Sequence, residues 1–543
     1  MARLRILPAG TGLLLVELDD LARTLALMDR LIDQPLPGIT ELVPAARTVM
    51  IAYDPALTDR ARISAALAGL DLAAARPRQG REIDIPVRYD GEDLEEVAAH
   101  LGWSVETLIR RHTQATYTVA FTGFAPGFAY MTADDPDFDV PRRSAPRVRI
   151  PAGSVAIAGR FGGIYPSDSP GGWQLLGRTP LAMWDTAREP PALLQPGDRV
   201  RFRAVDSLAA VPVSPPRPIA ARHSQPGTPV LTVLRADRPA LFQDLGRPGR
   251  AGQGIAASGA LDRGALLAAN RMLGNRRDAP VLEITFGGFA LRADAPLTLA
   301  VTGATAPLTI TTADGRALSA PFGKPFALDA GDRLALGTPA TGMRSYLAIR
   351  GGFAVVPVIG SASTDTMAKI GPETVEQGAV LSAAKLVIGS VDPSPLPLPP
   401  LPRAGETVTL DVIAGPRTDW FTAAGLATLT GQDWLVTPQS SRVGMRLSGE
   451  KTIERAEPGE LPSECTALGA IQVPHSGEPV LFLADHPLTG GYPVIGSVAA
   501  HHIDLAGQVP IGARIRFRLV TAFDPEILET RDGARPAAGE TDA

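Results

Sequence analysis

The first 80 residues alternate short apolar runs with segments of helical periodicity. The apolar runs are residues 13–18 and 48–53, and the helical segments are residues 19–33 and 58–70. Apolar side chains recur at spacings of three and four in the helical segments, which places them on one face of each helix. Asp19 or Asp20 and Thr58 are the expected N-caps. The pattern predicts a small α+β domain in which two helices cover one face of a sheet.

From residue 81 to about residue 207 the pattern becomes mainly β. Residues 82–90 alternate apolar and polar side chains, and helical patterns follow at residues 92–102 and 104–112. Gly102 suits the left-handed position that ends a helix, and Ser104 suits an N-cap. Beyond these helices the periodicity is that of strands, so a β-barrel or a strongly curved sheet is predicted.

Two proline-rich stretches divide the chain. Residues 208–229 and 391–403 carry closely spaced prolines without apolar periodicity, which is typical of linkers. Residues 524–543 are predicted to form a solvated tail. Three blocks remain, residues 1–207 (the first block), 230–390 (the middle block) and 404–523 (the third block), and the first block divides into the predicted domains 1–80 and 81–207.

One glycine-rich stretch, residues 147–185, contains a motif that is repeated near the end of the chain. Seven glycines lie between positions 151 and 180, and GGWQLLG there resembles GGYPVIG at residues 490–496. A strand, DRVRFR or ARIRFR, follows each after about 25 residues. The repeat predicts related barrels in the first and third blocks, facing each other across a cleft. Glycine turns can approach and bind an anion, although tight turns between strands would use the same glycines.

The middle block contains one clear helical pattern, at residues 260–273. Ser258 or Asp262 caps its start, so free backbone N–H groups there suit an anion, and an ordinary capped helix fits equally well. Glu283 is an acidic residue on an otherwise apolar strand. It is expected at an exposed edge or beside a partner, because an unpaired buried carboxylate is costly.

Composition narrows the class of protein. The 543 residues are 45% hydrophobic and 20% charged, with a net charge of −5, which is typical of a globular chain and argues against nucleic acid or membrane as partner. The single cysteine and the lack of a signal sequence or long apolar run predict a cytoplasmic protein. No zinc-type spacing or Walker P-loop occurs in the sequence.

Longer motifs carry a family resemblance. The motif FTGFAPGFAYM at residues 121–131, with the glycine-rich stretch, resembles the B-type subunit of 5-oxoprolinase, also described as allophanate hydrolase subunit 1 or the kinase-inhibitor type. From Leu231 on, LFQDLGRPG, ASGALD, SSRVGMRLSGE and ADHPLTGGYPVIGSV resemble the C-type subunit, the allophanate hydrolase subunit 2 or urea amidolyase-related type. The chain is therefore interpreted as a natural B–C fusion.

The resemblance implies a mainly β, α+β chain with cyclophilin-like barrels in both halves and a small α+β domain at the start. It also implies a partner, the A-type (lactam-utilisation type) subunit of 5-oxoprolinase, with ATP-dependent opening of 5-oxoproline or another lactam or amide. ATP, with Mg²⁺, is the expected cofactor, and no biotin is expected on this chain. A homo-oligomer is compatible with the sequence.

Two other functions share these modules. The first is the carboxyltransferase component of a urea carboxylase or allophanate-type biotin enzyme. The second is a non-enzymatic inhibitor of a histidine kinase. Gly371-Pro372 and Gly378-Ala379 replace glycine-containing pairs expected for the family, which leaves the substrate open.

The candidate site follows from the resemblance and the glycine repeat. Phosphoryl transfer needs groups that position and neutralise phosphate, and without a P-loop these are expected to be arginines and glycine turns. The expected catalytic residues are Arg178, Asp485 and Arg446, with Asp485 as the candidate metal ligand. The expected substrate- or nucleotide-binding residues are Phe124, Pro126, Gly127, Arg147, Gly171, Gly172, Trp173, Ser258, Asp262, Arg442, Thr489, Gly490, Gly491 and Tyr492. A purely structural role is the alternative for each of these residues, because arginines also tie strands together and aromatic side chains also fill barrels.

Overall fold

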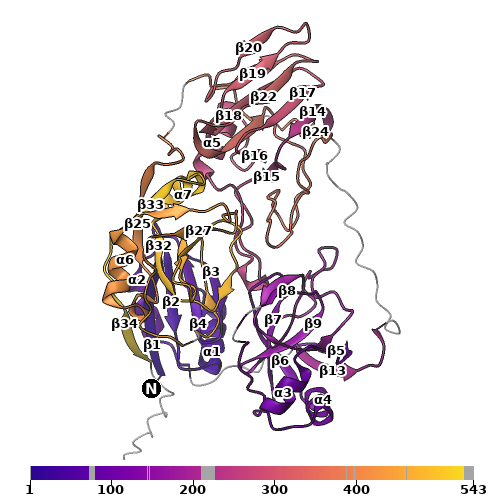
Figure 1. Cartoon of the computed structure of the whole chain (residues 1–543), viewed down its shortest axis with the longest axis vertical. Helices are drawn as coiled ribbons and strands as arrows, with labels where there is room; N and C mark the ends of the chain where they lie inside the picture. Colours follow the sequence, from indigo (N-terminus) through magenta and orange to yellow (C-terminus); the bar gives the residue numbers. More distant parts are fainter. Residues whose placement is uncertain are drawn as a thin grey trace, which may run out of the picture.

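The computed structural model describes residues 2–72, 80–143, 145, 147–208, 227–386, 388–394, 399–459 and 461–530. The middle block forms one body, the first barrel a second, and the N-terminal domain lies beside the barrel of the third block (Figure 1). No helix in the described ranges is long and apolar enough to cross a membrane.

The N-terminal domain is a five-stranded sheet with two helices. In sheet order its strands are β3 (Ile39–Pro44), β4 (Thr48–Tyr53), β2 (Leu13–Glu17), β1 (Ala2–Gly10) and β34 (Glu526–Thr530). The helices are α1 (Leu21–Asp33) and α2 (Arg60–Ala68). Asp20 caps α1 by accepting from the Arg23 N–H. The predicted cap Thr58 is wrong by one residue, since Asp59 caps α2 by accepting from the Arg62 N–H.

The edge strand β34 corrects the predicted tail. Its residues, 526–530, pair antiparallel with β1, and Leu4 lies opposite Leu528. Ser64 of α2 also donates to the Glu526 carboxylate over 2.7 Å. The segment EILET therefore finds a partner strand far away in sequence, with Leu528 packed against the core of the domain. Residues 531–543 of the predicted tail lie outside the described residues.

The first barrel is a seven-stranded sheet that is nearly closed. Its strand order is β12 (Gln174–Arg178), β9 (Ser154–Ala158), β10 (Phe161–Ile164), β7 (Ala129–Ala133), β6 (Tyr117–Thr122), β13 (Arg199–Ala204) and β5 (Glu82–Val87). A bridge between Arg88 and Arg178 links its two edges. Helices α3 (Leu94–His100) and α4 (Val105–Gln114) and the two-stranded antiparallel sheet of β8 (Arg147–Ile150) with β11 (Ser169–Gly171) complete it.

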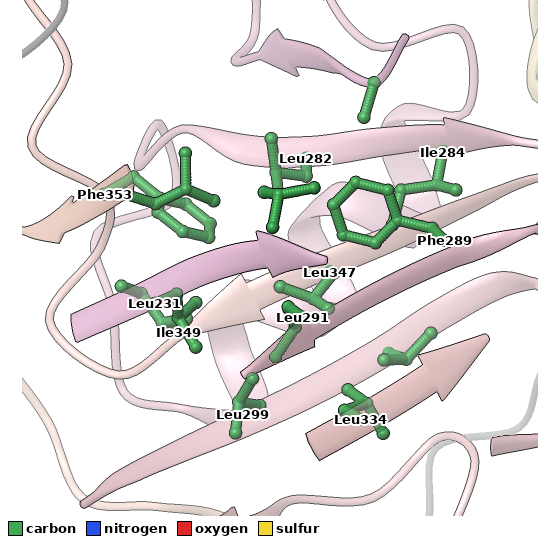
Figure 2. Close-up of a cluster of buried hydrophobic side chains, with 14 of the residues drawn as sticks. Leu231, Leu282, Ile284, Phe289, Leu291, Leu299, Leu334, Leu347, Ile349 and Phe353 are labelled. Atoms are coloured by element: carbon green, nitrogen blue, oxygen red, sulfur yellow. The ribbon is translucent and has the colours of Figure 1, made fainter. Parts of the chain in front are cut away.

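The middle block consists of two packed sheets and one helix. One sheet contains β20 (Ala317–Ser319), β19 (Leu308–Thr311), β22 (Arg333–Leu336), β17 (Phe289–Ala293), β14 (Thr228–Ala236) and β24 (Val380–Ala383). The other contains β15 (Leu241–Gln243), β16 (Val281–Thr285), β23 (Thr341–Ile349), β18 (Leu297–Thr305) and β21 (Phe326–Leu328). Leu231, Leu282 and Phe289 belong to the buried cluster between them (Figure 2). Helix α5 (Arg263–Met272) packs on β18 and β23, and η2 (Ala251–Gln253) precedes it.

The third block is a closed barrel. Its strands follow the order β25 (Thr407–Ala414), β32 (Val494–Val498), β29 (Ala470–Gln472), β30 (Val480–Phe482), β27 (Gly444–Ser448), β26 (Trp434–Val436) and β33 (Arg514–Leu519). The other elements are α6 (Ala423–Gly431), α7 (Ile503–Gln508), η3 (Thr418–Trp420), η4 (Ala500–His502) and the pair β28 (Glu464–Cys465) with β31 (Thr489–Gly490).

The two barrels have the same cyclic strand order. In the first, β13 pairs parallel with β5, which is bridged to β12, and β9, β10, β7 and β6 follow. In the third, β33 pairs parallel with β25, and β32, β29, β30, β27 and β26 follow. The strands that contain the ends of the repeated glycine motifs, β12 and β32, hold equivalent places, as do β13 and β33, which follow the motifs. The predicted mainly β, α+β fold with barrels in both halves is confirmed.

The predicted linkers are only partly described. Residues 209–226 of the first and 395–398 of the second lie outside the described residues. The described part of the second forms no helix or strand, and the Pro402 carbonyl accepts from the Gly342 N–H over 2.8 Å.

Candidate functional site

A pocket of about 480 Å³ lies between the two barrels. Its lining includes nine of the predicted site residues: Phe124, Gly171, Gly172, Trp173, Arg446, Thr489, Gly490, Gly491 and Tyr492. Both repeated glycine motifs therefore reach one cavity, as the predicted cleft required. Their roles there remain predictions.

Hydrogen bonds to Thr489 join the barrels at this pocket. The backbone N–H of Phe124 donates to Thr489 Oγ1 over 2.8 Å, and the Tyr130 hydroxyl lies 3.2 Å from the same atom. Phe124 has a φ of 61°, which turns the chain toward the partner barrel. A Cβ on Gly123 would lie 2.7 Å from the Thr489 methyl group, so the close approach requires glycine.

Three arginines give the pocket a positive lining. Arg142 donates to Ser463 Oγ over 2.9 Å, and Arg143 donates to Asp93 over 2.6 Å. The Arg446 side chain has no ion pair or hydrogen bond with any residue that the structure describes. None of the described lining residues is Asp or Glu. This donor set fits an anionic ligand such as a phosphate or a carboxylate.

The same lining decides how nucleotide and metal would fit. Arginine N–H groups and glycine-turn backbone suit the phosphates of ATP, which carry most of its charge. Mg²⁺ prefers carboxylate and water oxygens, and the described lining offers no carboxylate. The described lining therefore offers donors that suit phosphate groups and no carboxylate for Mg²⁺.

Aromatic side chains form the wall of the first barrel. Phe128 makes edge contacts with Trp173 and Tyr165, with ring centroids 5.3 and 5.4 Å apart. Burial raises the pKa of Tyr130 and Tyr165, so both hydroxyls stay neutral and can donate. A Cβ on Gly171 would lie 2.3 Å from the Tyr165 hydroxyl oxygen. Some of these aromatic side chains therefore fill the barrel, which was the structural role predicted as the alternative. They also face the cavity.

The structure places two predicted arginines in ion pairs away from the pocket lining. Arg178 is half exposed and pairs with Asp90, its Nε lying 3.2 Å from Oδ1. Arg147 pairs with Asp93 at 2.8 Å and with Glu92 at 3.1 Å. Neither lines the pocket. Their ion pairs tie strands β12 and β8 to the segment after β5.

The predicted catalytic and metal-binding residue Asp485 also lies away from the pocket. It is fully buried, and its carboxylate accepts from Arg442 Nε at 3.0 Å, Ser258 Oγ at 2.7 Å and the Thr366 N–H at 2.9 Å. Burial alone would raise the pKa of Asp485, but the Arg442 charge and these hydrogen bonds hold it below its ordinary value. This setting joins the middle block to the third barrel and leaves no carboxylate oxygen free for a metal ion.

Ser258, Asp262 and Arg442 belong to the same interface between the middle block and the third barrel. Arg442 also donates to Glu283, which accepts from the Tyr346 hydroxyl over 2.8 Å. Glu283 is therefore held for a partner, the second of the two predicted possibilities. Asp262 caps α5 by accepting from the Ala265 N–H over 2.8 Å. The turn at residues 258–262 is thus the start of an ordinary capped helix, one of its two predicted interpretations.

Pro126 and Gly127 form the turn that follows Phe124. Gly127 has a φ of 81°, and the turn packs against Gly254 of the middle block, where a Cβ would lie 2.7 Å from the Ala125 carbonyl. The turn thus shapes the edge of the pocket without contributing these two residues to its lining.

Sequence reasoning missed several lining residues. Arg142, Arg143, Ser463, Gln472 and His475 lie on connecting segments or short strands without a motif of their own. The adjacent arginines in PRRSAPR, just before the glycine-rich stretch, were the one available signal.

The structure also brings Asp411, His501 and His502 together in the third barrel. Their possible ligand atoms lie within 4.8 Å of one another. His502 Nδ1 accepts the Asp411 N–H over 2.8 Å, and Arg518 donates to the Asp411 carboxylate over 2.6 Å. These contacts engage the atoms that a metal ion would need.

Comparison with known proteins places this architecture in a family. Residues 4–194 match the carboxyltransferase domain, subdomain C and D, and residues 253–519 match the carboxyltransferase domain, subdomain A and B. The C-type subunit of 5-oxoprolinase from Escherichia coli K12 is 34% identical over 288 residues, which are 53% of this chain and 90% of that protein. The B-type subunit of 5-oxoprolinase from Escherichia coli O157:H7 is 40% identical over 180 residues, 32% of this chain and 82% of that protein. The chain belongs to the family of B-type and C-type 5-oxoprolinase subunits, with both parts in one polypeptide.

Two further relatives show how far this family extends. The crystal structure of TTHA0988 is 37% identical, with a TM-score of 0.78, and the match covers 92% of this chain and 97% of that chain. Urea amidolyase of Saccharomyces cerevisiae is 31% identical over 50% of this chain but only 16% of its own length. The fused B–C architecture thus has a solved counterpart along nearly its whole length, and its modules also occur in a larger enzyme. The names of the 5-oxoprolinase relatives imply a complex of several different polypeptides.

Proposed function

We propose that this chain is the B–C component of an ATP-dependent 5-oxoprolinase, working with a separate A-type subunit of the lactam-utilisation kind. The observation that carries the proposal is the pocket between the barrels, with three arginines and no carboxylate in its described lining. The two relatives named as parts of 5-oxoprolinase support it, since this chain covers most of the length of each.

The pocket suits activation of a lactam by phosphorylation. A lactam carbonyl is a poor electrophile, and phosphorylation of its oxygen creates a leaving group. Arg446, which has no partner in the described ranges, is the group best placed to neutralise transferring charge. Arg142 is fixed by Ser463, and the turns at Gly171 and Gly490 let backbone approach the ligand. Buried aromatic rings keep water from this wall of the cavity.

The direct test is reconstitution with an A-type 5-oxoprolinase subunit. Glutamate release from 5-oxoproline is measured with ATP, without ATP, and with Arg446→Ala in place of the wild-type chain. The proposal expects ATP-dependent glutamate that is at least about a hundredfold slower in the variant, the usual loss for one charge-stabilising group. ATP hydrolysis stimulated by urea or another amide, with no glutamate formed from 5-oxoproline, would refute it.

The carboxyltransferase function is the second candidate, favoured by the family descriptions and by the urea amidolyase match. It requires a carboxybiotin donor from another chain, since none of the matched domains is a biotin carrier. Carboxyl transfer from free carboxybiotin to urea, with no dependence on an A-type partner, separates it from the first proposal.

A further inference from the structure

His475 reaches the pocket between the barrels from a tight turn that connects β29 to β30. The Gly477 N–H donates to the Pro474 carbonyl over 3.0 Å, and the Gly477 carbonyl accepts from the Ile453 N–H over 2.9 Å. Gly477 has a φ of 74°, a conformation that favours glycine. The turn is therefore docked on the segment that carries Arg455, and it places Pro474 and His475 in the pocket lining.

Arg455 decides which nitrogen of this imidazole carries the proton. Arg455 Nη1 lies 3.1 Å from His475 Nδ1. A guanidinium only donates, so Nδ1 accepts and the ring proton lies on Nε2. Arg455 is itself held in place, because its Nη2 donates to the Gly459 carbonyl over 2.8 Å and its guanidinium lies 5.9 Å from the centre of the Trp420 ring.

The imidazole of His475 is neutral in this arrangement, because the charged form would carry a proton on both nitrogens. Its Nε2 has no hydrogen-bond partner among the residues that the structure describes. Tyr492 fixes the plane of the ring through an edge contact, with the ring centroids 5.4 Å apart. His475 thus brings one oriented N–H donor to a pocket whose described lining holds three arginines and no carboxylate.

We propose that His475 binds a phosphate oxygen of the ligand through its Nε2–H, as a neutral donor whose tautomer Arg455 sets. The proposal rests on the proposed function, because it takes the phosphate groups of ATP as the ligand. The arginines of the lining supply charge, and His475 adds a directed hydrogen bond without further charge.

The same tautomer excludes His475 as a general base toward the ligand, because Nε2 already carries a proton. Phosphoryl transfer to a lactam oxygen needs no base. That oxygen carries no proton, and it forms its bond to the γ-phosphorus while the bond from this phosphorus to the ADP oxygen breaks. A donor without a neighbouring base therefore suits this step.

The first test is calorimetric titration of the full chain with inorganic tripolyphosphate. His475→Phe keeps a flat ring beside Tyr492 but loses the donor, and it should bind the probe at least about tenfold more weakly. His475→Gln keeps an N–H donor and should retain the wild-type affinity within about threefold. His100→Phe, at an exposed histidine of α3 outside the pocket lining, is the matched control and should leave the affinity unchanged.

The second test determines the tautomer by nuclear magnetic resonance of the chain with nitrogen-15 in its histidine rings, at mildly alkaline pH. The His475→Gln spectrum assigns the signals of His475 by their absence. We expect the proton on Nε2, and Arg455→Met should move the Nδ1 resonance because it removes the donor to that atom. Addition of tripolyphosphate should move the Nε2 resonance.

Several results would overturn the proposal. They are a proton on Nδ1, an Nδ1 resonance that Arg455→Met leaves unchanged, no saturable binding of tripolyphosphate by the wild-type chain, and equal affinities of the His475→Phe and His475→Gln variants. Neither test uses turnover. Binding that depends on His475, without glutamate release in the reconstituted complex, would keep this proposal and refute the proposed 5-oxoprolinase function, and the opposite pair of results would do the reverse.

Discussion

The Phe124 N–H and Thr489 Oγ1, 2.8 Å apart, join two barrels whose bonded residues are 365 positions apart in the chain. The bond lies at the pocket, and both residues belong to its lining. The two walls of the pocket are therefore held in one register by a contact that neither barrel could make alone.

Replacing Thr489 with valine should separate the walls. Valine keeps the shape but removes the acceptor, which leaves the partly buried Phe124 N–H unpaired and costs about 1–3 kcal/mol of unfolding free energy. We expect glutamate release in the reconstituted complex to fall at least about tenfold, since catalytic groups tolerate little displacement. Thr489→Ser keeps the hydroxyl and is the control. Equal activity in both variants would show that the bond does not position the pocket.

The two predicted catalytic arginines of the barrels can be compared directly. Arg446→Ala should weaken binding of a non-hydrolysable ATP analogue at least about tenfold, because it removes a charge that faces the pocket. Arg178→Ala removes the same side chain from an exposed pair with Asp90 and should change the affinity by less than about twofold. Calorimetric titration measures both. A larger loss in Arg178→Ala would restore the catalytic role expected from the sequence.

Asp485→Asn should destabilise the fold. The variant leaves the buried Arg442 charge with only part of its compensation, and breaking a buried pair typically costs about 3–5 kcal/mol. Urea unfolding measures the change, and Asp168→Asn, at an exposed pair with Arg149, is the control and should change the stability far less, because water already screens that pair. Normal stability together with lost metal-dependent activity would instead favour the predicted metal ligand.

The pH dependence of stability should reveal Asp262. Burial raises its pKa to about 6, above the ordinary 3.8. Between about pH 4 and 6 the folded state therefore holds a proton that the unfolded chain has released, so the stability from this group is fully present below about pH 4 and falls as the pH rises. That contribution should disappear as the pH rises to about 6, a change of roughly 3 kcal/mol for a shift of about two units.

Asp262→Asn provides the comparison, because asparagine can still cap α5 but does not titrate. The wild-type free energy of unfolding, minus that of the variant, should fall between pH 4 and 7 in urea titrations. A constant difference over this range would mean that Asp262 titrates normally.

The edge strand β34 should stabilise the N-terminal domain. Ending the chain at residue 523 removes five paired positions from β1 and should cost at least about 2 kcal/mol. Ending it at residue 530 keeps the strand and is the control. Urea unfolding followed by hydrogen exchange of β1 amides checks both, and equal protection in the two truncated chains would contradict the role of β34.

The sequence predicted a site residue correctly where neighbouring residues in the chain determine its position, and failed where a partner far away in sequence does. Gly171, Trp173 and Gly490 reach the pocket as expected, because a glycine motif fixes its own turn and recurs in an equivalent strand. Arg178 and Asp485 do not, because a charged side chain is directed by its partner. Their partners, Asp90 and Arg442, lie 88 and 43 positions away, beyond any periodic pattern.

The fold shows the same limit. The strand pattern predicted the first barrel, the glycine repeat predicted the second, and apolar periodicity with helix caps predicted most helices, with Thr58 wrong by one residue. The short segment EILET looked like a tail because five residues carry little pattern, and only the open edge of β1 makes it a strand. Arg142 and His475 were missed because loops that line a pocket follow no period.

The pairing of β1 with β34 means that the first and last described strands are neighbours in one sheet. If the chain were cut in residues 208–229, the B and C pieces would still share that sheet, and the bond between them would become strand addition from one molecule to another. The covalent joint then acts mainly by raising the effective concentration of each piece near the other. Because the two parts are fused in this chain, they stay assembled even when the protein is dilute.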